Sequence, residues 1–134
     1  MAATVYNGVG NVTHTNNSGG NERILIYWIH KDSSAVVTIH WGDLSAADKP
    51  TATMDSNTNQ YVGLNLAYSM GSGNPSSAGT QVGEKSYSSS YTADGKPVPT
   101  ELFLADGEGF SITAPGASSY IIKGYNFIVI PEGN

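Results

Sequence analysis

Two strongly apolar runs between residues 22 and 42 constrain the fold of this chain more than any other feature. They read ERILIYWIHKDSSAVVTIHWG, with a polar interruption at residues 31–34. β-branched and aromatic residues favour strands, and a short polar break between two such runs predicts a β-hairpin. With the turn centred near Ser33, Trp28 would pair with Thr38 and Ile26 with His40.

Neither face of this hairpin has the polar character of a solvated sheet. Side chains alternate between the faces of a strand, and a half-exposed sheet alternates apolar with polar residues. We therefore expect one face to pack on the core and the other on a partner, although a slip of one residue would exchange them. The core face would comprise Leu25, Tyr27, Ile29, Val37, Ile39 and Trp41, and the partner face Ile24, Ile26, Trp28, His30, Val36, Thr38 and His40.

Composition places the whole chain in one all-β domain. Its 134 residues contain no cysteine, so packing and not disulfides must stabilise it, and they suffice for one core. Turn-rich intervals separate short strands, which predicts an antiparallel β-sandwich, jelly-roll-like, of eight or nine strands with residues 1–11 as an N-terminal arm. Beyond the hairpin, the predicted strands cover residues 4–6, 11–15, 60–69, 84–92, 100–105, 110–113 and 120–131, the last with a bulge at Gly124.

Charge and hydropathy exclude several partner classes. The net charge is −5 with no basic stripe, which argues against a nucleic acid or an anionic membrane surface. The longest apolar run, residues 24–29, is far shorter than the ~20 residues of a membrane span. The N-terminus lacks a basic region followed by an apolar one, so we expect no signal peptide and synthesis in the cytoplasm.

The three histidines, at positions 14, 30 and 40, are the first candidates for chemistry. Two histidines on one face could begin a metal site. The predicted register separates His30 from His40, however, and favours packed or surface imidazoles. Two alternatives stay open: equivalent histidines of symmetry-related chains could meet on an axis, or a histidine could lie beside Asp43 or Asp106 in an enzyme.

Other motifs give no catalytic centre. Residues 106–109 read DGEG, which suits a tight turn better than a calcium loop. No nucleophile elbow, cysteine nucleophile or phosphate-binding loop is present, so we expect no enzyme activity, no metal and no cofactor. Tyrosines can stack on sugar rings or fill protein interfaces, so the low-specificity candidates for partner or glycan contact are Tyr61, Tyr68, Tyr87 and Tyr91.

Two stretches of the sequence resemble small virion proteins of tailed bacteriophages. They are PTELFLADGEGFSI followed by YNFIVIPEG, and TVYNGVGNVTHTNNSGGNERILIYWI near the N-terminus. The resemblance implies a compact, usually homotrimeric sandwich without catalytic residues, found as a capsid cement (decoration) protein or as the tip of a tail fibre.

From the resemblance we expect a homotrimeric capsid cement protein, located in the virion and bound to the major capsid protein or another virion protein. No nucleic acid or membrane partner is expected. The alternatives are a receptor- or glycan-binding fibre tip and a free lectin-like module. The expected subunit interface comprises Ile24, Ile26, Trp28, His30 and His40, with the capsid touched by residues 2–11, 43–59 or 70–83.

Overall fold

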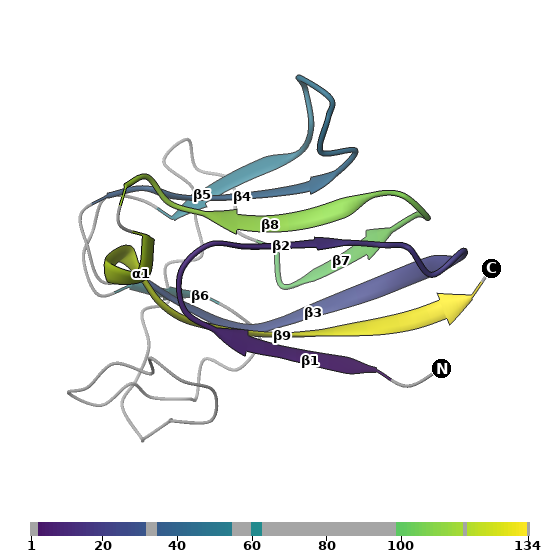
Figure 1. Cartoon of the computed structure of the whole chain (residues 1–134), viewed down its shortest axis with the longest axis horizontal. Coiled ribbons are helices and arrows are strands. Elements are labelled where there is room, and N and C mark those ends of the chain that lie inside the picture. The colour runs from purple at the N-terminus through teal and green to yellow at the C-terminus, as the bar shows by residue number, and fades with distance from the viewer. Residues whose placement is uncertain (1–2, 32–34, 55–59, 63–98, 117, 134) are drawn as a thin grey trace.

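The computed structural model describes residues 3–31, 35–54, 60–62, 99–116 and 118–133, which form two antiparallel sheets packed face to face (Figure 1). Sheet A has the order β1 (Thr4–Gly8), β9 (Ile122–Gly133), β3 (Asn21–Lys31), with β6 (Gln60–Val62) and β7 (Glu101–Leu104) both pairing with β3. Sheet B has the order β2 (Val12–Thr15), β8 (Gly109–Thr113), β4 (Val37–Gly42), β5 (Thr51–Met54). The prediction of an all-β antiparallel sandwich is confirmed.

Successive strands mostly alternate between the two sheets. The chain passes from sheet A to sheet B and back through β1, β2, β3 and β4, and again through β7, β8 and β9. This alternation suits a jelly roll. The jelly-roll assignment and the full strand number stay predictions, since residues 63–98 lie outside the described chain.

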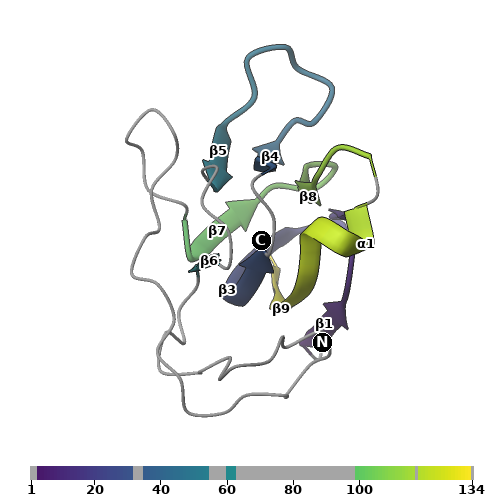
Figure 2. The ribbon, with the colours of Figure 1, turned by 90° about the vertical axis from the view of Figure 1, so that its left-hand side faces the viewer.

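The core lies between the inner faces of the two sheets, which Figure 2 shows end-on. Phe127 of β9 is fully buried, with its ring 5.0 Å from Phe110 of β8 in an edge-to-face contact and 4.9 Å from the stacked ring of Tyr6. Aromatic pairs at these separations add to the free energy of burial itself. Ile24 and Ile26 of β3 and Ile39 of β4 complete the centre of this core.

The predicted hairpin between residues 22 and 42 is wrong, because its two strands belong to different sheets. β3 pairs with β9 and with β6 and β7, whereas β4 pairs with β5 and β8. Trp28 therefore lies opposite Asn126 and not Thr38, and Ile26 lies opposite Phe127 and not His40. A strand that is buried on both faces is apolar whichever strands pair with it. Its composition therefore does not tell which strand lies beside it.

A bulge at Tyr27 reverses the faces of β3 along its length. Ile26 pairs with Phe127 and Trp28 with the adjacent Asn126, which leaves Tyr27 as the extra residue. Before the bulge, the even-numbered residues of β3 face the core; after it, Ile29 does, opposite Tyr125. An extra residue in one strand has this effect on every side chain that follows it.

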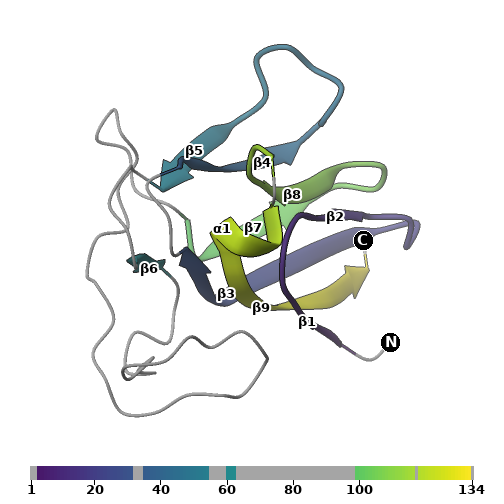
Figure 3. The same ribbon diagram turned by 60° about the vertical axis from the view of Figure 1, so that its left-hand side comes forward.

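The other predicted elements are partly confirmed. A register shift pairs His30 with Gly124 and Lys31 with Ile122, so the β9 bulge lies where it was predicted. The predicted strand at residues 4–6 is β1, which pairs with β9. The loop after residue 43 contains β5, which was missed, and one helical turn, α1 (Ser118–Ile121), leads directly into β9 (Figure 3). The predicted strand at residues 84–92 lies outside the described residues.

Candidate functional site

The five residues of the expected subunit interface do not share a surface. Ile24 and Ile26 are fully buried in the core, where strands of this same chain cover them. Trp28 and His30 face the opposite side of sheet A and are also fully buried, while His40 lies half-buried on the outer side of sheet B. The interface assignment is wrong, because the predicted hairpin register ignored both the bulge and the change of sheet.

The tyrosine candidates fall mostly outside the described residues. The backbone of Tyr61, in β6, pairs with that of His30 in β3. The Tyr61 side chain, together with Tyr68, Tyr87 and Tyr91, is not among the parts that the structure describes.

His40 and Asp43, a predicted histidine–carboxylate pair, hydrogen-bond other residues. His40 Nδ1 lies 2.9 Å from Thr51 Oγ1, and desolvation lowers the pKa of His40, with a further contribution from the nearby Lys49. The Asp43 carboxylate instead accepts hydrogen bonds from the Ser45 hydroxyl and backbone N–H, which hold the pKa of Asp43 below its usual value.

His14 makes a contact between the two sheets. Its Nε2 donates to Glu22 Oε1 at 2.7 Å, with 10% and 7% of the two side chains exposed, and its ring meets the edge of Tyr6 at 5.5 Å. His14 belongs to sheet B, and Glu22 and Tyr6 to sheet A. The pair therefore ties the sheets together, and nothing adjoining it in the described residues suggests catalysis.

The outer face of sheet A carries an apolar row across neighbouring strands. Val5, Ile128 and Leu25 are cross-strand neighbours on β1, β9 and β3, and the row ends at Glu101 of β7. Cross-strand neighbours share one face of a sheet. Val5 is 53% exposed, and Leu25 and Ile128 are half-buried. This row is much less polar than a row on a solvated sheet face usually is.

The outer face of sheet B carries hydroxyl groups instead. One row across it consists of Thr13, Ser111, His40 and Thr51, and the next contains Thr113, Thr38 and Thr53. Threonine combines a high strand propensity with a polar group, so it suits an outer face that meets water.

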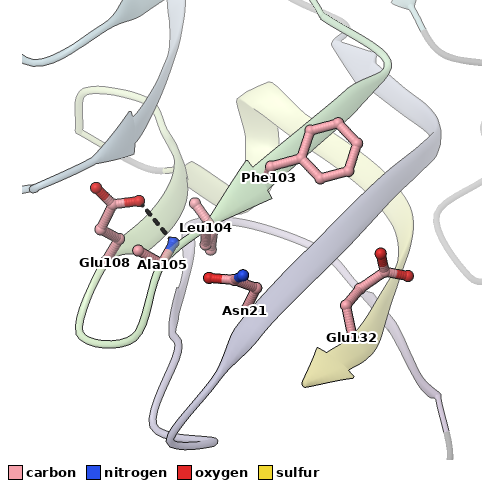
Figure 4. A pocket seen from close by; sticks show the side chains of 6 residues that line it. All are labelled: Asn21, Phe103, Leu104, Ala105, Glu108 and Glu132. Atoms are coloured by element: carbon pink, nitrogen blue, oxygen red, sulfur yellow. Dashed lines mark hydrogen bonds between the residues drawn. The ribbon is translucent and has the colours of Figure 1, made fainter. Parts of the chain in front are cut away.

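A groove opens at one end of sheet A (Figure 4). Figure 1 marks both chain termini at this end. The volume of the groove is about 560 Å³. Phe103 of β7 and Glu132 of β9 form its sides, and Asn21 of β3 lies between Glu132 and Glu108 in Figure 4. The remaining lining residues are Leu104, Ala105 and Glu108.

Phe103 is the most unusual residue of this groove, since 63% of it is exposed. It pairs with Arg23 on the outer face, and Arg23 forms ion pairs with Glu101 at 3.2 Å and Glu132 at 3.5 Å. The sequence contained a signal for it: in the run Glu101-Leu102-Phe103-Leu104, period-two alternation puts Phe103 on the side opposite the buried leucines.

Two turns beside the groove are joined by Asn16. The fully buried Asn16 side chain donates to the backbone oxygens of Gly20 (2.9 Å) and Leu104 (3.1 Å), and its backbone N–H and C=O bond to Glu108 and Gly107. Across the same junction, Gly19 N–H donates to Asp106 Oδ1 at 2.9 Å. Buried, satisfied networks of this kind fix one arrangement of the backbone.

The turn at residues 105–108 is tight, as predicted. Glu108 N–H donates to the Ala105 oxygen at 3.0 Å, and Gly107 has φ +89°, which glycine adopts without strain. The Glu108 carboxylate accepts from Ala105 N–H at 2.8 Å, the bond drawn in Figure 4. This bond fixes the Glu108 side chain at the groove.

Carboxylates dominate the electrostatics around the groove. They come from the start of β3, from β7, from the turn after it and from the end of β9, and are Glu22, Glu101, Asp106, Glu108 and Glu132. Among the described residues of these segments, Arg23 is the only lysine or arginine. This end of sheet A therefore attracts cations.

Comparison with known proteins adds no relative: no family model, curated protein or solved structure matches this chain. In the described ranges, no three His, Asp or Glu side chains lie close enough together to hold a metal ion. No helix in the described part of the chain is long and apolar enough to cross a membrane. The fold and the surface geometry define an antiparallel β-sandwich with an apolar row on one outer face and an acidic groove at one end of the same sheet.

Proposed function

We propose that this chain is a homotrimeric capsid cement (decoration) protein of a tailed bacteriophage, assembling through the outer face of sheet A. The apolar row of Val5, Leu25 and Ile128 supports assembly most directly. Exposed apolar surface of this kind marks interaction sites, and closed symmetric homo-oligomers are the commonest way to cover it. The virion assignment itself rests on the sequence resemblance.

The proposed mechanism is stabilisation by mass action. A protein that binds the assembled lattice, but not its separate subunits, lowers the free energy of the lattice by its own binding free energy. That stabilisation is about 4 kcal/mol at a thousandfold excess over the dissociation constant. The major capsid protein is the proposed partner, and neither catalysis nor a cofactor is part of the proposal.

A fibre tip that binds a receptor or glycan is the second candidate. The exposed Phe103 ring in the groove favours it, since aromatic rings stack on sugars. A glycan-array signal from a protein with no affinity for capsids would support the fibre tip, whereas a monomer with sugar-dependent melting would point to a free lectin-like module.

The test of assembly uses a matched pair of lysine variants, one on an edge strand of each sheet. Val5→Lys places a charge on the outer face of sheet A, and Thr13→Lys places the same charge on the outer face of sheet B. Both positions are exposed, so both variants should fold. Light scattering should give three times the 14.0 kDa chain mass for the wild type and Thr13→Lys, and a monomer for Val5→Lys.

A monomeric wild type would overturn the trimer. A Val5→Lys variant that stays trimeric would show that subunits meet elsewhere. Co-sedimentation with purified capsids completes the test, because a cement protein should saturate the lattice and raise its melting temperature.

A further inference from the structure

We propose that the groove at Phe103 binds a short segment of another protein in which a lysine or arginine lies next to a large apolar side chain. The proposal does not rest on the cement function or on trimer formation. It follows from three properties of the groove: an exposed aromatic ring, an excess of carboxylates and a fixed backbone.

The apolar part of the site is formed by Phe103, Leu104 and Ala105. A Phe ring left 63% exposed beside a cavity of about 560 Å³ offers an apolar surface large enough to receive side chains of a ligand. Large exposed aromatics are enriched where proteins bind one another.

The charged part selects a cation. Glu132 and Glu108 line the groove and Glu101 lies on the adjacent surface, opposed by Arg23 alone among the described residues nearby. A cation over the face of Phe103 would also be attracted by the ring quadrupole. A neutral saccharide gains nothing from the excess negative charge, so the charge favours a basic peptide over a sugar.

The site is held in place before any ligand arrives. Asn16 joins the turn before β3 to the turn after β7, and the Glu108 carboxylate is fixed by Ala105 N–H. A Cβ on Gly20 would lie 2.9 Å from backbone atoms of Gly133, so the ends of β3 and β9 are also in close contact. Pre-organised sites lose less entropy on binding.

The test measures fluorescence anisotropy of a short labelled peptide that alternates leucine with lysine. The comparison ligands are the same peptide with glutamate in place of lysine and a mixture of neutral oligosaccharides. The lysine peptide should bind more weakly as salt rises, because the attraction includes a screened charge term. The glutamate peptide should not bind.

Two pairs of variants locate the binding. Phe103→Ala should weaken peptide binding about fivefold, the loss expected for one cation–π contact. Tyr120→Ala removes another exposed aromatic, 72% accessible in α1 at the opposite end of the sandwich, and should change nothing. Glu132→Gln should weaken binding and flatten its salt dependence, whereas Asp48→Asn, an exposed carboxylate after β4, should not.

Equal affinity for the lysine and glutamate peptides would overturn the proposal, as would lysine-peptide binding that Phe103→Ala does not weaken. If the protein bound a saccharide and Phe103→Ala abolished that binding, the ligand of the groove would be a sugar and not a peptide. Val5 does not line the groove. Peptide binding by Val5→Lys would therefore support the groove as a peptide site even if the protein proves monomeric.

Discussion

The outer faces of the two sheets have opposite chemistry. Sheet B presents threonine, serine and a half-buried histidine, whereas sheet A presents valine, leucine and isoleucine in one row and, near it, a phenylalanine that is 63% exposed. Both sheets belong to the same sandwich and share one core. The difference shows that the core does not determine the outer faces, and that sheet A is the face suited to contact another molecule.

Sheet A also differs along its own length. Before the bulge at Tyr27, the outward residues Arg23 and Leu25 are half-exposed; after it, the outward residues Trp28 and His30 are fully buried. One end of this face is therefore covered within the chain, and the other end stays open. The predictions below test this contrast and the contrast between sheets.

The largest effect is expected at Trp28. Trp28→Ala should lower the free energy of unfolding by about 3–5 kcal/mol, as for a buried core residue, although Trp28 faces away from the core. Trp28→Phe should cost only about 1–2 kcal/mol, since the indole N–H has no hydrogen-bond partner among the described residues. Urea unfolding followed by circular dichroism measures both. A small loss for Trp28→Ala would mean that this end of sheet A is open to water.

A smaller effect is expected at Arg23, whose ion pairs link three strands of sheet A. Arg23→Met should change the free energy of unfolding by at most about 1 kcal/mol, because the side chains are 35–43% exposed and water screens them. The wild type should lose stability in high salt and the variant should not. Thermal melts at two salt concentrations measure this, and an equal response would show that the pairs contribute nothing.

The smallest effect is expected at His40 on sheet B. Burial and Lys49 place the pKa of His40 below its unfolded value of 6.5, so the unfolded chain binds the proton more readily. Above pH 6.5 the contribution is constant, and as pH falls below 6.5 the fold loses stability. His40→Gln should remove that part of the pH dependence, measured as the difference in melting temperature between the two proteins at pH 7 and pH 5. An unchanged difference would contradict the lowered pKa.

The sequence predicted which residues form strands better than it predicted which strands pair with one another. The bulge near Gly124 was predicted because glycine marks it, whereas the bulge at Tyr27 lies in an unbroken apolar run with no glycine or proline. The hairpin between β3 and β4 failed for a related reason: a short polar turn suits a hairpin and a crossover equally, and only long-range pairing with β9 decides between them. The groove depends on segments about 80 residues apart, which no local pattern reveals.

The Asn16 side chain donates to the carbonyl of Leu104, 88 positions away. The groove beside it also needs Glu132, near the end of β9. When only the first two thirds of these residues have been synthesised, Asn21 is present, but neither Phe103 nor Glu132, which form the sides of the groove, has been made. A partner can therefore bind in the groove only after β7 and β9 have been made and the sandwich has closed.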